Sequence, residues 1–208
     1  MLGSHNSLTY LSPKTLWGKI LSPWTKCQDK DLIRQYNNGA RYFDIRVRFD
    51  KDGNPVAVHN KVEYRGDVYH ILELLNEYIQ VNGFNKAYLR LILDIRSKSD
   101  FEENQLLRQR LLFVEFCHKV INLYDNLVVA SAITYWNWQS VMPYIAVYKD
   151  IQPPTISELD YRGLIEIHAS VTAKWYEYLL GTKWYADSIR ELYDSYKIRE
   201  SIYLVDYI

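Results

Sequence analysis

RYFDIRVRF, residues Arg41–Phe49, alternates in polarity and is rich in residues that favour β-strands. It is followed by Asp52-Gly53-Asn54-Pro55, a typical turn sequence, and then by the short apolar run Val56–His59. This pattern predicts a strand, a tight turn and a second extended segment. Asp44 and Arg46 stand two residues apart in the first strand, so their side chains share one face of it.

Strand-like and helix-like segments alternate outward from this stretch. The expected helices are Val68–Val81, Asp100–Leu123, Trp175–Leu179 and Asp187–Tyr196. The expected strands are Ala87–Ile95, Leu127–Ala132, Tyr144–Tyr148, Gly163–Ile167 and Ser201–Tyr207. Such alternation predicts an α/β fold with parallel strands joined by crossovers.

We expect a single domain over residues 1–208 with a compact or irregular (β/α)8 TIM-type barrel. An open, doubly wound sheet is the alternative architecture. No glycine-rich phosphate loop follows any expected strand, and this favours the barrel over a nucleotide-binding sheet.

Composition excludes several classes of protein. The 25 Lys and Arg balance the 25 Asp and Glu, so we expect no nucleic-acid partner. Cys27 and Cys117 are the only cysteines and show no zinc-like or CxxC spacing, so the sequence indicates neither a disulfide scaffold nor a thiolate metal site. No basic segment followed by an apolar run marks a signal peptide, and no apolar stretch reaches the ~20 residues of a membrane helix. We expect a monomer, and both secretion and peripheral membrane association fit the sequence.

In a barrel, chemistry takes place at the carboxyl ends of the strands. The polar residues expected there or within the strands are His5, Asp44, Arg46, His59, Asp94, Arg96 and Asp206. Two imidazoles can take a proton from an attacking hydroxyl and give one to a leaving alkoxide, while a guanidinium binds the phosphoryl oxygens. This set of groups indicates phosphodiester cleavage. His70, His118 and His168 are interpreted as structural, and the Asp44–Arg46 pair alone is equally consistent with a structural ion pair.

Several segments together resemble the phosphatidylinositol-specific phospholipase C X-domain family in order and spacing. The resemblance is strongest over residues 3–59 and is carried by Gly3–Ser7, Trp24–Gln28, Gln35–Val47 and Val58-His59. Pro154–Ile156, Tyr161–Ile165 and Ile202–Asp206 are similar to the family's later segments. The resemblance implies a phospholipase C type of phosphodiesterase, a phosphoric diester hydrolase or lyase of lipid metabolism.

Residue by residue, the resemblance implies that His5 is the general base and that Asp206 orients it. His59 resembles the general acid, and Arg46 stands where metal-independent bacterial members stabilise the phosphoryl charge. Calcium-dependent members carry an acidic ligand at the position of Arg46, and a guanidinium cannot bind Ca²⁺. We therefore expect no metal and no other cofactor.

The substrate-binding residues expected from this comparison are Asn6, Asp94 and Arg96, and Arg96 resembles the basic residue of the metal-free type. Bacterial metal-free members usually have Asp where this chain has Asn6. An amide can accept a hydrogen bond from His59 but carries no charge, which predicts weaker support of an imidazolium and reduced activity. His168, Ala169 and Ser170 replace the family's basic residues near the headgroup, so headgroups other than inositol stay open.

Trp17 and Trp24 lie where the family carries a short helix that touches the membrane. Tryptophan favours the bilayer interface, so we expect a transient membrane contact there. The alternative is that these side chains pack the rim of the barrel, and it applies more to Trp24 than to Trp17.

Three further hypotheses for the function stay open: a catalytically silent barrel that binds phospholipid headgroups or a protein, a glycerophosphodiesterase, and a calcium-dependent enzyme.

Overall fold

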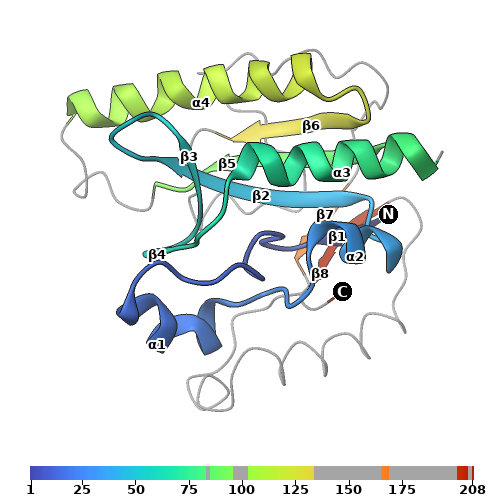
Figure 1. Cartoon of the computed structure of the whole chain (residues 1–208), viewed down its shortest axis with the longest axis horizontal. Helices are drawn as coiled ribbons and strands as arrows, with labels where there is room; N and C mark the ends of the chain where they lie inside the picture. The colour runs from blue at the N-terminus through green and yellow to red at the C-terminus, as the bar shows by residue number, and fades with distance from the viewer. Residues whose placement is uncertain (83–84, 96–102, 134–164, 169–200, 206–207) are drawn as a thin grey trace.

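The computed structural model describes residues 1–82, 85–95, 103–133, 165–168, 201–205 and 208. Within this part, the chain forms a mixed α/β fold (Figure 1). The helices are α1 (Leu16–Thr25), α2 (Leu32–Asn37), α3 (Val68–Asn82) and α4 (Glu103–Leu123). The strands are β1 (Leu2–Ser4), β2 (Tyr42–Phe49), β3 (Pro55–His59), β4 (Val62–Glu63), β5 (Ala87–Leu93), β6 (Leu127–Ile133), β7 (Ile165–His168) and β8 (Ser201–Val205).

The described strands belong to one sheet whose parallel part has the order β6-β5-β2-β1-β8-β7. This confirms the predicted parallel strands and mixed α/β class. β3 pairs antiparallel with the end of β2, and β4 pairs antiparallel with β3. A closed barrel would require the two edge strands of this parallel order, β6 and β7, to be joined. Residues 134–164 connect these edges and lie outside the described residues, so the closed barrel stays a prediction.

The predicted strand, turn and second strand are confirmed at β2 and β3. In the turn, the Asp50 carboxylate accepts hydrogen bonds from the backbone N–H groups of Asp52 at 2.9 Å and Asn54 at 2.8 Å. Gly53 has φ of 88°, a conformation that glycine adopts without a steric penalty. Local turn chemistry therefore fixes how β3 returns beside β2.

The predicted elements at Val68–Val81, Ala87–Ile95, Leu127–Ala132 and Ser201–Tyr207 agree with α3, β5, β6 and β8 within the described residues. The described parts of the elements predicted at Asp100–Leu123 and Gly163–Ile167 fall in α4 and β7. The elements expected at Tyr144–Tyr148, Trp175–Leu179 and Asp187–Tyr196 lie outside the described residues. The six-residue helix α2 was not predicted, because it is too short to show a helical period.

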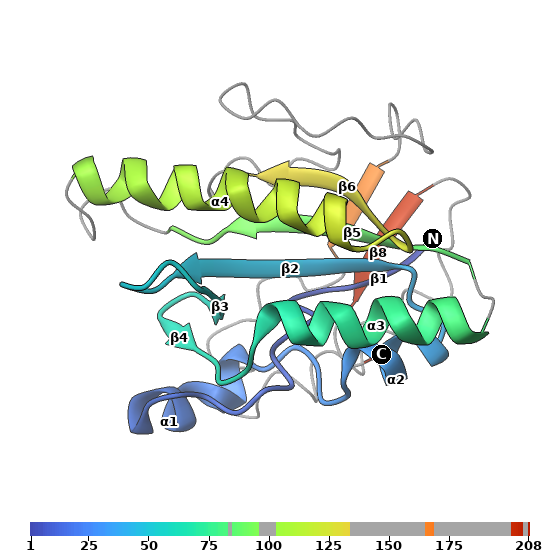
Figure 2. The same cartoon turned by 45° about the horizontal axis from the view of Figure 1, so that its top comes forward.

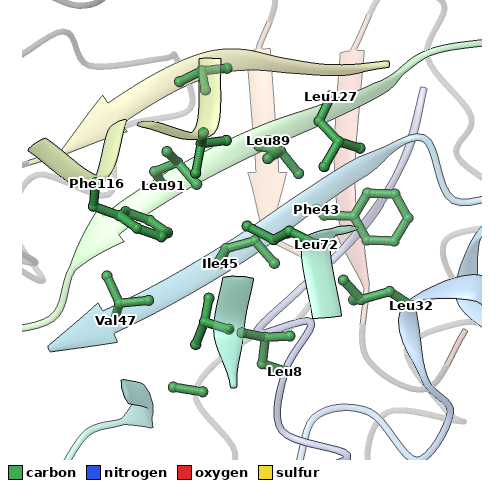
Figure 3. Packing of buried hydrophobic residues seen from close by; sticks show 14 of the residues in the cluster. Leu8, Leu32, Phe43, Ile45, Val47, Leu72, Leu89, Leu91, Phe116 and Leu127 are labelled. Carbon is green, nitrogen blue, oxygen red and sulfur yellow. The ribbon is translucent and has the colours of Figure 1, made fainter. Parts of the chain in front are cut away.

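One face of the sheet carries the hydrophobic core beneath α3 and α4. Alternate residues of β2 point to this face and pack with side chains of β5 and of both helices (Figure 3); the cluster includes Phe43, Ile45, Val47, Leu72, Leu89, Leu91 and Phe116. Because side chains alternate along a strand, Asp44 and Arg46 face the opposite side of β2. The core therefore fixes which side of the sheet carries the polar groups.

No helix in the described part of the chain is both long and apolar enough to cross a bilayer. The helix α1 instead lies at the end of the sheet toward which β2, β5 and β6 point, next to β4 (Figure 2). Thr15 caps its first turn by accepting a hydrogen bond from Gly18 N at 3.0 Å.

Phe116→Ala is expected to lower the free energy of unfolding by about 3–5 kcal/mol, because the ring is fully buried between Phe49 and Tyr69. Urea denaturation measures this change. Leu111→Ala on the same helix is the matched control, since Leu111 is 57% exposed and its loss should change stability by less than about 0.5 kcal/mol. Equal effects of the two substitutions would contradict this position of the core.

Candidate active site

Three predicted residues from distant parts of the sequence meet at the carboxyl end of the sheet. His5 follows β1, Arg46 lies within β2 and His59 ends β3. Arg46 Nη2 is 3.0 Å from His5 Nε2, and the rings of His5 and His59 are 6.4 Å apart between centroids. Two imidazoles and a guanidinium from three distant segments therefore lie close together.

The buried carboxylate of Asp44 holds Arg46 in place beside the two histidines. Its side chain is fully buried, and its Oδ2 accepts hydrogen bonds from Arg46 Nε at 3.0 Å and Nη2 at 2.8 Å. The same oxygen accepts one from Asn6 N at 3.1 Å, while Oδ1 accepts one from Arg90 Nη1 at 3.2 Å. Both carboxylate oxygens are thus engaged by charged or backbone donors.

The surroundings of Asp44 keep it ionised. Burial by itself raises the pKa of the Asp44 carboxyl, but the charges of Arg46 and Arg90 outweigh burial. The neighbouring His5 and the hydrogen bond from Arg46 act in the same direction and hold that pKa well below its usual range. Asp44 therefore supplies a permanent negative charge that fixes Arg46.

The contact with Arg46 determines the protonation pattern of His5. A guanidinium has only donors, so the lone pair of His5 Nε2 accepts the hydrogen bond from Arg46 Nη2. His5 Nε2 also lies 3.9 Å from Asp44 Oδ2. Chemically, His5 is held in the form that can take up a proton at Nε2.

Asn6 lies between the two imidazoles. Its Nδ2 is 3.2 Å from His5 Nε2 and 3.3 Å from His59 Nε2. The amide therefore donates toward the histidines in this arrangement, whereas the sequence comparison led us to expect it to accept from His59. Asn6 has φ of 45°, a left-handed conformation that asparagine tolerates better than most residues, and this directs its backbone N–H at Asp44.

His59 is oriented from its other side. Its Nδ1 lies 2.6 Å from the backbone oxygen of Thr25, the last residue of α1. A carbonyl only accepts, so Nδ1 carries a proton and proton exchange falls to Nε2. The Nε2 atoms of both histidines consequently face the same space around Asn6.

Buried polar side chains hold the loop that carries His5. The Thr9 hydroxyl accepts hydrogen bonds from Cys27 N and Gln28 N at 2.9 and 3.0 Å and donates to Asn6 O at 2.8 Å. Gln28 Nε2 donates to His5 O at 3.1 Å.

Gln35 holds the same loop from another side chain. Its Nε2 donates to the backbone oxygen of Ser7, and its Oε1 accepts from the Ser4 hydroxyl. Hydrogen bonds from these side chains to backbone groups of the loop therefore hold it in place, in addition to packing.

The remaining predicted residues fall into three groups. Asp94 is buried, and its Oδ2 accepts from Asn60 N at 3.0 Å, so it holds the turn that follows His59. Trp17 and Trp24 lie on α1, with 74% and 37% of their surface exposed. Arg96 and Asp206 lie outside the described residues. Where the structure is described, no cluster of three or more His, Cys, Asp or Glu could hold a metal ion.

Some residues of the site were not predicted from sequence. Arg90 is the clearest case, because it is an arginine inside the apolar run Ala87–Leu93 and is almost fully buried. A buried charge in a strand calls for a partner, but the sequence alone does not say that the partner is Asp44. Thr9 and Gln35 carry no local pattern that marks them, since their roles depend on contacts across the fold.

Asp44→Asn is expected to destabilise the chain at neutral pH by about 3–5 kcal/mol, because Arg46 and Arg90 lose their buried counter-charge. The folded-state pKa of Asp44 is lowered, so its stabilisation is complete above the unfolded value of about 3.9 and is lost below it. The difference from wild type should therefore shrink by about 1.4 kcal/mol per pH unit below that value. Urea denaturation from pH 7 to pH 2.5 measures it.

The exposed carboxylate of Asp52 provides the control for this series. Asp52→Asn should change stability by less than about 0.5 kcal/mol at pH 7. A gap between wild type and Asp44→Asn that stays constant down to pH 2.5 would show that the charge of Asp44 is not what stabilises the fold.

No family model matches the chain. A 1-phosphatidylinositol phosphodiesterase from Staphylococcus aureus is 42% identical over 102 residues, covering 49% of this chain and 30% of the relative. A PI-PLC X-box domain-containing protein from Dictyostelium discoideum is 31% identical over 121 residues, covering 46% of this chain and 16% of the relative. The chain thus matches less than a third of the length of these curated relatives.

The fold is similar to a solved structure as well. A variant of the phosphatidylinositol-specific phospholipase C from S. aureus superposes with a TM-score of 0.67 and 16% identity, covering 100% of this chain and 84% of the other. At this low identity the superposition shows similarity of the fold alone, whereas the matches to the two curated relatives show similarity of sequence. Sequence and fold together confirm the resemblance of this chain to the phosphatidylinositol-specific phospholipase C X-domain family.

Proposed function

We propose that this chain is a phosphodiesterase that cleaves a phosphatidylinositol-like phospholipid by intramolecular attack of a headgroup hydroxyl. The observation that carries the proposal is that His5 Nε2 and His59 Nε2 both lie within 3.3 Å of Asn6 Nδ2, with Arg46 Nη2 3.0 Å from His5 Nε2. The similarity to proteins named phosphatidylinositol phosphodiesterases supports the same substrate class.

In the first half of the reaction, His5 Nε2 takes the proton from the headgroup hydroxyl next to the phosphate. The oxygen forms a bond to phosphorus, and negative charge grows on the phosphoryl oxygens. Arg46 donates to these oxygens while Asp44 keeps its guanidinium in place. In the proposal, Asp206 orients His5, and Asn6, Asp94 and Arg96 bind or position the substrate.

In the second half, the bond from phosphorus to the diacylglycerol oxygen breaks. Protonated His59 gives its Nε2 proton to that oxygen, while its Nδ1–H stays on the Thr25 carbonyl. The products are diacylglycerol and a cyclic phosphodiester of the headgroup. After one turnover His5 holds a proton and His59 lacks one, so proton exchange with water or hydrolysis of the cyclic ester restores the enzyme.

The helix α1 is proposed as the contact with the lipid surface. Only Gly18 and Thr25 of this helix are buried. Its large apolar side chains are exposed, and they are Leu16, Trp17, Ile20, Leu21 and Trp24. Tryptophan and aliphatic side chains on one short helix suit the boundary between headgroups and acyl chains. The chain then meets the membrane only transiently while it acts on phospholipid.

His5→Ala and His59→Ala are each expected to lower kcat for phosphatidylinositol by about 10²–10⁴-fold, because each removes one proton-transfer group. Release of cyclic inositol phosphate from phosphatidylinositol vesicles in EDTA is the measurement. His70→Ala is the control, since His70 is exposed on α3 and pairs only locally with Glu73 at 3.3 Å. We expect full activity in that variant.

The same assay separates the other functions. Loss of wild-type activity in EDTA, restored by Ca²⁺, would identify a calcium-dependent enzyme. Turnover of glycerophosphodiesters but not of phosphatidylinositol would identify a glycerophosphodiesterase. Silence with both of these and with lysophospholipids would leave a barrel that binds headgroups or a protein.

Trp17→Ala is expected to weaken binding to phosphatidylcholine vesicles by about tenfold or more, because it removes an exposed indole that would leave water at the interface. Sedimentation with vesicles measures the bound fraction. Leu107→Ala on α4 is the control for an exposed apolar residue away from α1. Equal binding by wild type and Trp17→Ala would remove α1 from the membrane contact.

A further inference from the structure

The last carbonyl of α1 is the acceptor that orients His59. The final four C=O groups of a helix have no intrahelical donor, so they need partners elsewhere. Thr25 O receives His59 Nδ1–H at 2.6 Å and also the Tyr64 hydroxyl at 3.2 Å. The Cys27 thiol, a weak donor, lies 3.9 Å away. This carbonyl is thus shared between the proposed general acid and a tyrosine.

Tyr64 is well placed to fix that carbonyl. Its side chain is fully buried, and its hydroxyl also lies 3.1 Å from Thr25 Oγ1. Its backbone N–H donates to Ala57 O at 2.9 Å, across the β3–β4 hairpin whose first strand ends in His59. His59 and Tyr64 therefore reach the same oxygen from two sides of one hairpin.

Close packing limits the movement of α1 relative to this hairpin. A Cβ atom at Gly18 would lie 2.9 Å from Pro13 Cβ and 3.2 Å from Val62 Cγ1, so the helix approaches β4 as only a glycine allows. Pro13 forms a β-bridge with Tyr64, and Lys14 N donates to Glu63 O at 2.8 Å. The helix end, the tyrosine and the histidine form one tightly connected unit.

From these contacts we infer that Tyr64 is a positioning residue for His59 and acts through the last carbonyl of α1. Tyr64 holds Thr25 O where this oxygen receives His59 Nδ1–H, which leaves Nε2 for the proposed substrate. Without the tyrosine hydroxyl, the helix end is held less firmly and the imidazole loses its single orientation. The expected effect on kcat rests on the proposed function, whereas the expected tautomer of His59 does not.

Tyr64→Phe tests the inference by nuclear magnetic resonance of the full chain with ¹⁵N-labelled histidine side chains, without substrate. In the wild type, neutral His59 should carry its proton on Nδ1; a wild-type signal for the Nε2–H form would overturn the inference without any variant. In Tyr64→Phe we expect a mixture of the two tautomers at His59 and unchanged signals from His5 and His70. His59→Ala assigns the signal.

Kinetics provide the second measurement. Tyr64→Phe should lower kcat for phosphatidylinositol by roughly three- to tenfold, the size of one hydrogen bond, with KM unchanged because Tyr64 is not proposed to touch substrate. Tyr124→Phe is the matched control, since it removes a tyrosine hydroxyl that donates to a backbone carbonyl, Tyr69 O at 2.9 Å. We expect no change there in the His59 signal or in kcat.

A further variant separates the carbonyl from the side chain of Thr25. Thr25→Val removes the competing Oγ1 acceptor but keeps the carbonyl, so the Nδ1–H form of His59 should persist. An unchanged tautomer in Tyr64→Phe, or a mixture in Thr25→Val alone, would overturn the inference. A wild type that shows the expected tautomer but cleaves no phospholipid would instead refute the proposed function.

Discussion

The arrangement at the end of the sheet depends on one buried carboxylate. Asp44 lies between Arg46 and Arg90 and also receives a backbone N–H from Asn6. Burying this charge is costly without partners, and burying two guanidiniums beside each other without it is costly as well. The three charges therefore require one another, and together they fix β2, β5 and the loop after β1.

From that carboxylate the rest of the site follows by contact. The carboxylate places the Arg46 guanidinium, which in turn makes His5 Nε2 an acceptor. The left-handed backbone of Asn6 then carries its amide between the two imidazoles. Asn6 is neutral, so the electrostatic support for a charged histidine comes from Asp44 and from backbone oxygens such as Thr25 O.

The sequence was informative where structure depends on neighbours along the chain. The β2–β3 turn, the amphipathic α3 and the run of β5 are all set by local patterns, and the structure agrees with them. The meeting of His5, Arg46 and His59 was expected from the places of the histidines after expected strands, of Arg46 within one, and from the family resemblance. The Arg90–Asp44 pair, 46 residues apart, and the hydroxyl of Thr9 were not predictable, because only the folded register brings their partners within reach.

Only two of the ten residues of α1 are turned inward, and these are Gly18 and Thr25. Gly18 lies against Pro13 and Val62, and the backbone carbonyl of Thr25 meets His59. Substitutions on the exposed side of this helix can therefore change the chemistry of that surface without touching the contacts that orient His59.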